Sequence, residues 1–371
     1  METLGITLDI TKKVSELTVA QMQLLEIAKA ISYNSKLVIM DEPTSALTDS
    51  EVDILFNLIR RLRSQGVAMV YITHKLEELP KIADRVCVLR DGYMISSRAI
   101  ENVCREVMIS EMVGRKMEQI YPKTNKRIGE ILFETKNLSR QGVFEKISFQ
   151  LHRGEILGFA GMVGAGRTEI VSSIFGITPC SGGQILLNGE AIHIRSPRDA
   201  LRYRLALIPE DRARDGLNLI GDIRSNICMT VIDKLSYLKG IVPDRRLEKK
   251  RAEQMIADMQ IRCTGEKQIV HSLSGGNQQK IVVGKWLLTE PQVIFLDEPT
   301  RGIDVGAKYE IYQLIQKLAS EGKGVLVISS EMPELLGICD RIIVLKEGRI
   351  CGEFATAEAT QERIMETIVR E

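Results

Sequence analysis

Short apolar runs and longer amphipathic stretches alternate along both ends of the chain. Near the N-terminus, an apolar run at 37–40 precedes an amphipathic stretch over 51–64, and a second apolar run follows at 67–72. The same order returns toward the C-terminus, in the segments 293–296, 308–320 and 324–328. Such apolar runs are typical of strands buried on both faces, and the amphipathic stretches are typical of helices. Both ends therefore predict strand–helix–strand units of an α/β fold, with a parallel sheet covered on both faces.

Two stretches of the sequence match each other in a fixed register. The segment Asp41–Thr44 (DEPT) returns as Asp297–Thr300, which sets an offset of 256 residues. The same offset aligns the segments 17–21 and 273–277. The register holds over roughly eighty residues without a gap, as expected for two copies of one domain. Between the copies, 98–117 predicts a helix, and the polar stretch 121–129 predicts a linker.

A glycine-rich segment, GMVGAGRT, contains Gly161, Gly164, Gly166, Arg167 and Thr168. It follows a predicted strand over 155–160 and opens a predicted helix over 168–175, which is the context of a phosphate-binding loop. The glycines let backbone N–H groups surround phosphate oxygens, and the threonine hydroxyl is a ligand for Mg²⁺. Arginine stands where that motif has lysine, and its planar fork does not replace a compact ammonium. We therefore expect nucleotide binding to persist and hydrolysis to be slow.

Acidic pairs end the corresponding predicted strands of the two copies. Asp41 and Glu42 follow the first strand of the first copy, and Asp297 and Glu298 follow its counterpart in the second. Ligands of parallel sheets bind at the carboxyl ends of the strands, so both pairs lie where a ligand is expected.

A further segment, Ser274, Gly275 and Gly276, opens a predicted helix and offers a hydroxyl and free N–H groups to an anion. With it in place, the motifs resemble the ATP-binding-cassette (ABC) ATPases. LSGGNQQK corresponds to the signature of that family, and FLDEPT corresponds to its Walker B segment. Together with LTVAQMQLLEIAKA, GMVGAGRTE, PEDR, DEPTRGIDVGAK and ISSEMPEL, they resemble the tandem ATPase subunits of bacterial sugar importers, such as those for ribose, galactose or methylgalactoside, and xylose.

The resemblance implies a P-loop NTPase fold of the ABC type, with one complete copy preceded by the C-terminal part of another. It implies ATP and Mg²⁺ as cofactors, and two domains that dimerise head to tail around each nucleotide. Asp297, and Asp41 in the first copy, would hold the metal ion. Glu298 and Glu42 would orient the attacking water.

Two more site residues follow from the resemblance. His74 stands where the family has a histidine that touches the γ-phosphate, and the second copy has Ser330 at that position. Glu210 stands where the family usually has a glutamine, in a loop that senses nucleotide and faces the membrane partner. The alternative for Glu210 is a charged surface turn.

We expect three segments: residues 1–97 as the C-terminal part of a first ABC domain, 98–129 as a linker, and 130–371 as a second, complete domain. At the fixed offset, the first copy's phosphate-binding loop would precede Met1. The site containing Glu42, His74 and the good signature would then lack its phosphate cradle. Arg167 would face the first signature, in which Thr18–Ala20 has no glycine. We therefore expect slow or no hydrolysis by this chain alone, and low solubility caused by uncovered apolar surface.

Composition limits the kind of partner. The net charge is +1, from 50 basic and 49 acidic residues, and gives no reason to expect nucleic acid. Seven scattered cysteines without a C-x-x-C pair favour thiols in a cytosolic protein. No apolar run approaches the ~18 residues of a membrane helix, and no signal peptide is recognisable. Any membrane role is therefore expected to come through a partner.

The resemblance names such partners as membrane permease subunits and, through them, a periplasmic or extracellular sugar-binding protein. It places the chain as a peripheral protein on the cytoplasmic face of the membrane, where ATP binding and hydrolysis drive monosaccharide uptake. The alternatives are a nucleoside-importing tandem subunit and a nucleotide-binding remnant without transport function. A soluble ABC protein acting on ribosomes or DNA is disfavoured, because such proteins carry good signatures in both copies.

Overall fold

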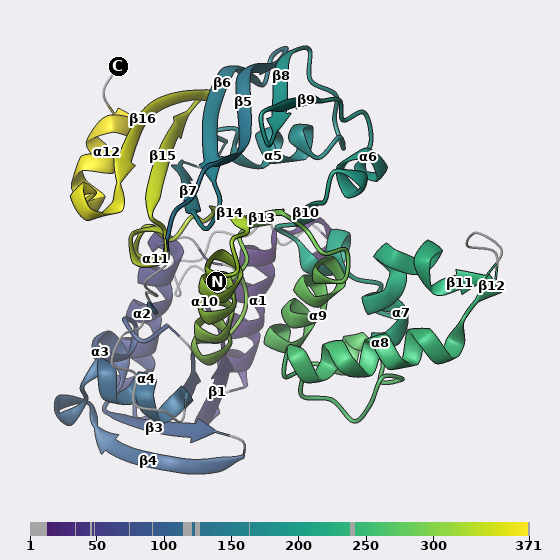
Figure 1. Cartoon of the computed structure of the whole chain (residues 1–371). Coiled ribbons are helices and arrows are strands. Elements are labelled where there is room, and N and C mark those ends of the chain that lie inside the picture. The colour runs from purple at the N-terminus through teal and green to yellow at the C-terminus, as the bar shows by residue number, and fades with distance from the viewer. Residues whose placement is uncertain are drawn as a thin grey trace. The chain divides into compact units, whose positions relative to one another are not determined.

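The computed structural model describes two compact units, Met1–Met117 and Glu118–Glu371 (Figure 1). Each unit is considered by itself. The described residues are 13–33, 35–44, 47, 49–73, 75–90, 92–113, 121–122, 127–162, 164–237 and 242–369. Across these ranges, no helix has both the length and the apolar content that crossing a bilayer requires.

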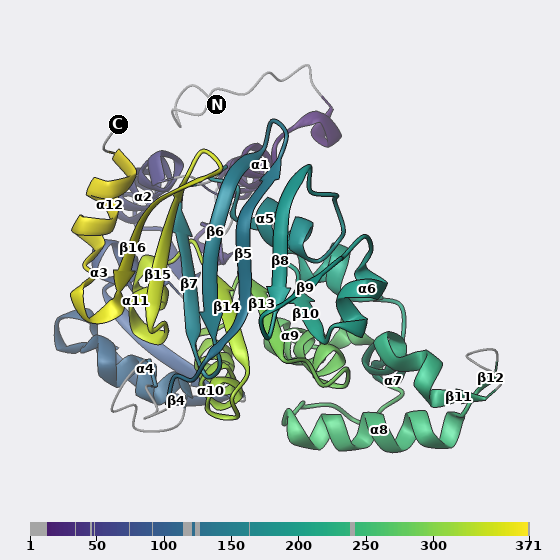
Figure 2. The same ribbon diagram turned by 45° about the horizontal axis from the view of Figure 1, so that its top comes forward.

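A six-stranded sheet with the order β10-β13-β14-β7-β15-β16 forms the centre of the second unit. Figure 2 shows β16, β15, β7 and β14 side by side. All neighbours are parallel except β15 and β16, which form an antiparallel hairpin. The bounds are β7 Ile156–Gly161, β10 Leu205–Ile208, β13 Val293–Asp297, β14 Gly324–Ile328, β15 Arg341–Lys346 and β16 Arg349–Ala355. The predicted α/β class and parallel sheet are confirmed.

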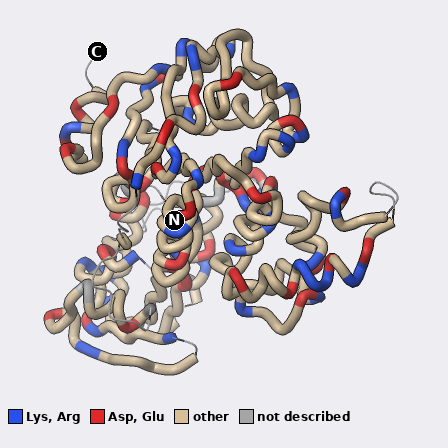
Figure 3. Tube along the Cα trace, viewed as in Figure 1, with Lys and Arg blue, Asp and Glu red and all other residues tan. Residues whose placement is uncertain are grey.

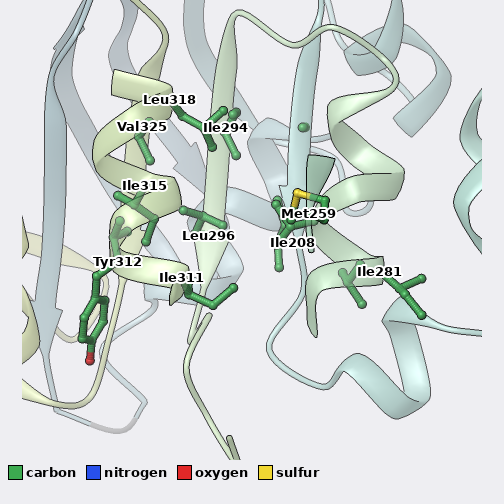
Figure 4. Close-up of a cluster of buried hydrophobic side chains, with 14 of the residues drawn as sticks. Ile208, Met259, Ile281, Ile294, Leu296, Ile311, Tyr312, Ile315, Leu318 and Val325 are labelled. Carbon is green, nitrogen blue, oxygen red and sulfur yellow. The ribbon is translucent and has the colours of Figure 1, made fainter. Parts of the chain in front are cut away.

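Helices cover one face of this sheet. In Figure 4, Ile311 and Ile315 of one helix, α10, lie toward Ile294 and Leu296 of β13. The alternate residues of β13, Val293 and Phe295, belong to a second apolar cluster on the other face. The helices of this unit are α5 Arg167–Ile174, α6 Pro197–Arg202, α7 Ile223–Cys228, α8 Arg245–Asp258, α9 Gly275–Leu287, α10 Val305–Ser320, α11 Met332–Ile338 and α12 Gln361–Val369.

An antiparallel sheet with the order β6-β5-β8-β9 packs over that second cluster, together with α5. Its Phe133 contacts Phe295 of β13 edge to face at a centroid distance of 5.7 Å. The strands are β5 Ile131–Arg140, β6 Phe144–His152, β8 Gly182–Leu187 and β9 Glu190–Ile192. The sequence pattern did not predict this layer.

On the β10 side of the sheet, α7, α8 and a small hairpin extend away from the strands (Figures 1 and 2). Aspartate caps begin α8 and α10: Asp244 accepts from the N–H groups of Arg246 and Leu247, and Asp304 accepts from that of Ala307. The hairpin strands are β11 Ser236–Tyr237 and β12 Val242–Pro243, and the short turns are η4 Arg212–Gly216, η5 Met229–Leu235, η6 Val270–Ser272 and η7 Thr356–Glu358.

The first unit repeats part of this architecture in the same register. Leu37 of β1 pairs with Ala68 of β2, as Val293 pairs with Gly324 256 residues later. Even the irregularity in the β15–β16 hairpin recurs in the β3–β4 hairpin. The elements are η2 Val14–Glu16, α1 Val19–Ser32, β1 Leu37–Asp41, α2 Asp49–Ser64, β2 Ala68–Ile72, α3 Leu79–Ile82, β3 Arg85–Arg90, β4 Tyr93–Ala99, η3 Ile100–Asn102 and α4 Arg105–Val113.

The helix predicted over 98–117 begins later than expected. Arg98 still belongs to β4 and pairs with Val86 of β3, and α4 begins at Arg105. Hairpin pairing with β3 therefore overrides the local helical pattern at its start.

Charges of both signs are distributed along both units (Figure 3). The seven cysteines all lie within the described residues and form no disulfide.

Candidate functional site

The glycine-rich loop lies between β7, which ends at Gly161, and α5, which begins at Arg167. Gly164 and Gly166 have φ angles of 82° and 91°, a left-handed conformation that favours glycine. A Cβ on Gly161 would lie 2.6 Å from the carbonyl oxygen of Leu345. The loop therefore needs its glycines to turn at this edge of the sheet. Residue 163 lies outside the described part of the chain.

The side chain of Arg167 is folded against the end of β14. It is 9% exposed, and its Nη1 donates to the carbonyl oxygen of Ser329 at 3.0 Å. Its positive charge also lowers the pKa of both Asp297 and Glu298, opposing the larger effect of burial. The arginine is thus committed to a backbone carbonyl as well as to the acidic pair.

Asp297 has a buried carboxylate oxygen whose hydrogen bonding is incomplete. The residue is 2% exposed, and its Oδ1 is buried with no hydrogen-bond partner among the described residues. Burial raises its pKa to about 7, and a hydrogen bond from Thr168 opposes that rise. An unsatisfied buried carboxylate oxygen is costly unless a cation or a donor completes it.

The same two side chains fit a hard cation. A hydroxyl and a carboxylate oxygen are ligands that Mg²⁺ accepts, usually together with phosphate and water. Within the described residues, no group of three or more His, Cys, Asp or Glu side chains could hold a metal ion. Thr168 and Asp297 would supply only two of the six ligands of an octahedral Mg²⁺, which leaves positions for phosphate oxygens and water.

Glu298 adopts a left-handed backbone conformation, with φ 46°, and Glu42 does so in the first unit, with φ 44°. Such strain in a non-glycine residue is often found at functional sites. Ser330, the counterpart of His74, donates to Oε2 of Glu298 at 3.1 Å. Burial raises the pKa of Glu298. Position 330 thus orients the predicted base, whereas His74 lies outside the described residues.

Asp41 and Glu42 lie at the end of β1, as predicted, but both are exposed. Asp297, the counterpart of Asp41, is 2% exposed and interacts with Arg167 and Thr168 at the start of α5. A counterpart of α5 is absent from the described residues of the first unit.

Glu210 follows β10 and forms an ion pair with Arg301, which comes directly after the segment Asp297–Thr300. Its negative charge raises the pKa of Asp297 and of Glu298. The structure therefore brings Glu210 to the same edge of the sheet as the acidic pair.

Comparisons with known proteins agree with this geometry. Residues 144–301 match the family model described as ABC transporter. A putative ribose/galactose/methyl galactoside import ATP-binding protein of Halalkalibacterium halodurans is 48% identical over 99% of this chain and 70% of its own length. The chain belongs to the ABC transporter ATP-binding proteins.

Other relatives of this ABC protein are named for individual sugars. A ribose import ATP-binding protein of Bacillus cereus is 48% identical over 94% of this chain and 70% of its own length. A galactose/methyl galactoside import ATP-binding protein of Fusobacterium nucleatum is 46% identical over 98% of this chain and 73% of its own length. A solved nucleotide-free ATP-binding cassette shares the fold, with a TM-score of 0.56 and 18% identity over 65% of this chain and all of the other.

The signature segment of this ABC protein begins α9. Ser274 is the N-cap residue, and its hydroxyl accepts a hydrogen bond from the side-chain amide of Asn277 at 2.9 Å. A Cβ on Gly276 would lie 2.5 Å from Cβ of Ala307, so glycine lets α9 approach the start of α10. The structure places Ser274, Gly275 and Gly276 together at the start of α9. No described hydrogen bond joins them to the glycine-rich loop.

Sequence reasoning missed a buried carboxylate in each unit of this ABC protein. Glu334 is fully buried and accepts hydrogen bonds from Thr300, at 2.9 Å, and from Ser329. In the first unit, Glu78 accepts from Thr44 at 2.6 Å and from Thr73 at 3.1 Å. The fixed offset of 256 residues aligns Glu78 with Glu334, and that alignment is the signal that could have found them.

Proposed function

We propose that this chain is the ATP-binding, energy-coupling subunit of a monosaccharide importer, in which binding and hydrolysis of MgATP drive uptake. The observation that carries the nucleotide part is the unsatisfied Oδ1 of Asp297 beside Thr168, at the mouth of the glycine-rich loop. The names of the relatives support ribose, galactose or methyl galactoside as the sugar.

In this proposal, each group of the second unit has a separate task. The N–H groups of the glycine-rich loop bind phosphate oxygens, and Arg167 contributes positive charge. Thr168 and Asp297 would hold Mg²⁺, which would neutralise charge on the phosphates. Glu298, oriented by Ser330, accepts a proton from the attacking water. Glu42, Asp41 and His74 are proposed to do the same work for the first copy.

The partners in this proposal are membrane permease subunits and, through them, a periplasmic or extracellular sugar-binding protein. The chain would act as a peripheral protein on the cytoplasmic face of the membrane. Residues 1–97 would be the C-terminal part of one ABC domain, 98–129 a linker, and 130–371 a complete second domain.

We further propose that this chain alone hydrolyses ATP slowly or not at all. One reason is Arg167: its guanidinium donates to the Ser329 carbonyl, and this broad planar group cannot take the place of a compact lysine ammonium between phosphates. The other reason is a cavity inside the first unit, between β2 and β3.

A cavity of about 570 Å³ lies there, lined by apolar side chains that include Met40, Val70, Ile72, Val86 and Met108. In the second unit, β7 fills the corresponding place and pairs with both β14 and β15. β7 is also the strand that carries the phosphate-binding loop. The described first unit therefore has the acidic strand end without the strand that would present a phosphate to it.

Calorimetric titration of the purified chain with MgATP tests the nucleotide site. Binding is expected for the unaltered chain, and Thr168→Val is expected to weaken binding in the presence of Mg²⁺ far more than in EDTA. Thr367→Val, at a half-buried position on α12 away from the nucleotide site, is the matched control. Equal affinities of the unaltered chain and Thr168→Val in both conditions would contradict the proposed metal site.

Uptake assays separate the sugar proposal from its alternatives. Proteoliposomes that hold the chain, its permease and its binding protein are expected to accumulate ribose or a galactoside when loaded with ATP. Accumulation of a nucleoside instead would favour a nucleoside importer. Nucleotide binding without any ATP-dependent uptake would favour a non-transporting remnant.

A further inference from the structure

A π-helical turn, Arg212–Gly216, follows Glu210 and is fixed by its own cap. The Asp211 carboxylate accepts from the N–H groups of Ala213, at 2.9 Å, and Arg214, at 3.0 Å. These backbone hydrogen bonds, that of Arg214 first, lower the pKa of Asp211. The turn therefore forms a defined platform for the side chain of its first residue.

Arg212 joins this turn to the loop that follows the acidic pair. Its Nη1 donates to the carbonyl oxygen of Arg301 at 2.7 Å, and its Nη2 donates to that of Gly302 at 3.0 Å. A planar guanidinium can hold two consecutive carbonyls in this way, and a lysine ammonium cannot. Burial lowers the pKa of Arg212 because it removes water from the guanidinium. The two carbonyls replace part of that lost hydration.

The same guanidinium reaches the start of α9. Its Nε lies 3.5 Å from Oε1 of Gln278. A Cβ on Gly275 would lie 2.8 Å from Nη2 of Arg212 and 2.9 Å from the carbonyl oxygen of Gly302. Glycine at 275 therefore leaves the space in which Arg212 bonds the loop. The first copy has Val19 at the corresponding position.

A second contact fixes the other end of the turn to α9. Lys285 is 4% exposed, and its Nζ donates to the carbonyl oxygen of Gly216 at 2.5 Å. Gln278 and Lys285 are two helical turns apart and so lie on one face of α9. The turn is thus attached to one helix at both of its ends.

Glu210 is bound to the same loop from the opposite direction. Its carboxylate pairs with Arg301, whose carbonyl oxygen is held by Arg212. A change at Glu210 that breaks this pair therefore acts on the residue that Arg212 anchors. Displacement of the loop then reaches the first turn of α9 through the guanidinium.

We infer that Arg212 is a positioning residue that couples the nucleotide-binding edge of the sheet to the signature helix α9 within the same unit, through the carbonyls of Arg301 and Gly302. The inference rests on the proposed nucleotide site. It assigns Gly275 a second task, which is to make room for this joint.

Hydrogen exchange of the whole chain, measured with and without MgADP, tests the coupling. In the unaltered chain, MgADP is expected to slow exchange at 161–168 and, through the joint, at 273–279 by about tenfold. In Arg212→Ala, slowing at 161–168 remains, the affinity for MgADP stays within about twofold, and slowing at 273–279 is lost. Arg212→Lys keeps the charge without the fork and is expected to lose the same distant effect.

Arg214→Ala is the matched control, because Arg214 lies in the same turn and bonds the neighbouring Asp215 on the surface. It is expected to behave as the unaltered chain. If Arg212→Ala keeps the MgADP effect at 273–279, the coupling is wrong and the nucleotide site stands. If the unaltered chain shows no MgADP effect even at 161–168, the proposed nucleotide site itself fails, and the coupling falls with it.

Discussion

The role of each buried carboxylate in the second unit depends on whether its neighbours satisfy its hydrogen-bonding capacity. Asp297 keeps a buried oxygen without a described partner, whereas the buried carboxylate of Glu334 has both oxygens hydrogen-bonded. Asp297 therefore suits a reversibly bound ligand. Glu334 instead forms a permanent link between Thr300, next to the acidic pair, and Ser329, at the end of β14.

Glu334 gives a prediction about pH. Burial is the main cause that raises its pKa from 4.5 to about 7; Glu331 raises it further, and hydrogen bonds from Ser329 and Thr300 and the charge of Lys308 oppose the rise. Between those pH values the folded chain binds more protons than the unfolded chain, so the free energy of unfolding falls as pH rises. The loss is at most about 3 kcal/mol, from about 1.4 kcal/mol per pKa unit.

Glu334→Gln is therefore expected to remove most of this loss and to be more stable than the unaltered chain at pH 8. Urea unfolding of the second unit from pH 4.5 to 8 measures it. Glu253→Gln, at an exposed carboxylate on α8, is the control and should keep the original slope. An unchanged slope in Glu334→Gln would mean that another group causes the pH dependence.

Arg167 gives a prediction about nucleotide affinity. Arg167→Lys replaces the fork with a compact ammonium that suits a position between phosphates, and it releases the Ser329 carbonyl. MgATP is expected to bind more tightly by about tenfold, or about 1.4 kcal/mol. Arg167→Ala removes the charge and is expected to bind more weakly than the unaltered chain. Calorimetry distinguishes the three, and weaker binding by the lysine variant would show that the arginine is the better ligand here.

At the scale of elements, the start of α9 is fixed by two close approaches rather than by helix propensity. Gly275 faces Arg212 and the Gly302 carbonyl, and Gly276 faces Ala307 at the start of α10. Two adjacent glycines are poor helix formers, so their presence needs such a packing reason. The segment thus lets α9 pack closely against the start of α10.

Gly276→Ala is expected to separate the starts of α9 and α10. Its Cβ would lie 2.5 Å from Cβ of Ala307, which is too close for a non-bonded contact. The free energy of unfolding should fall by about 1–3 kcal/mol, the usual cost of such overpacking. Gly182→Ala, where nothing lies within 4 Å, is the control and should change it by much less. Equal stability of the two variants would mean that α9 shifts without cost.

For the molecule as a whole, the two units differ in how much of their apolar surface is covered. Leu37, Ile39, Val70 and Ile72 are 52%, 65%, 46% and 47% exposed. Their counterparts in the second unit, Val293, Phe295, Leu326 and Ile328, are buried against β5, β6, β7 and α5. A contiguous apolar face of this kind favours association.

The chain is therefore expected to self-associate at high concentration. Ile39→Lys combined with Val70→Lys should keep it monomeric, since both side chains point away from the small core of the first unit. Val38→Lys, whose native side chain is 6% exposed, is the contrasting variant and should unfold that unit. Sedimentation and circular dichroism measure the two effects. Unchanged association in the double variant would mean that the chain self-associates through another surface.

The sequence by itself determined the repeat, the strand–helix–strand order and the place of the glycine-rich loop between a strand and a helix. Each of these depends on local periodicity or on the backbone freedom of particular residues, such as Gly164 and Gly166. The confirmed register of β1–β2 against β13–β14 follows from the same local pattern. Relatives and the family model then confirmed the ABC resemblance.

Only the tertiary structure decided which distant groups meet. The antiparallel layer β6-β5-β8-β9, the bond from Arg167 to Ser329, the joint at Arg212 and the burial of Glu334 join residues far apart in the sequence. Their partners are chosen by packing and by the need to satisfy buried polar groups, and neither leaves a local pattern. Glu334 is the instructive case, since its sequence neighbours suggest an ordinary helix and only the fold buries its carboxylate.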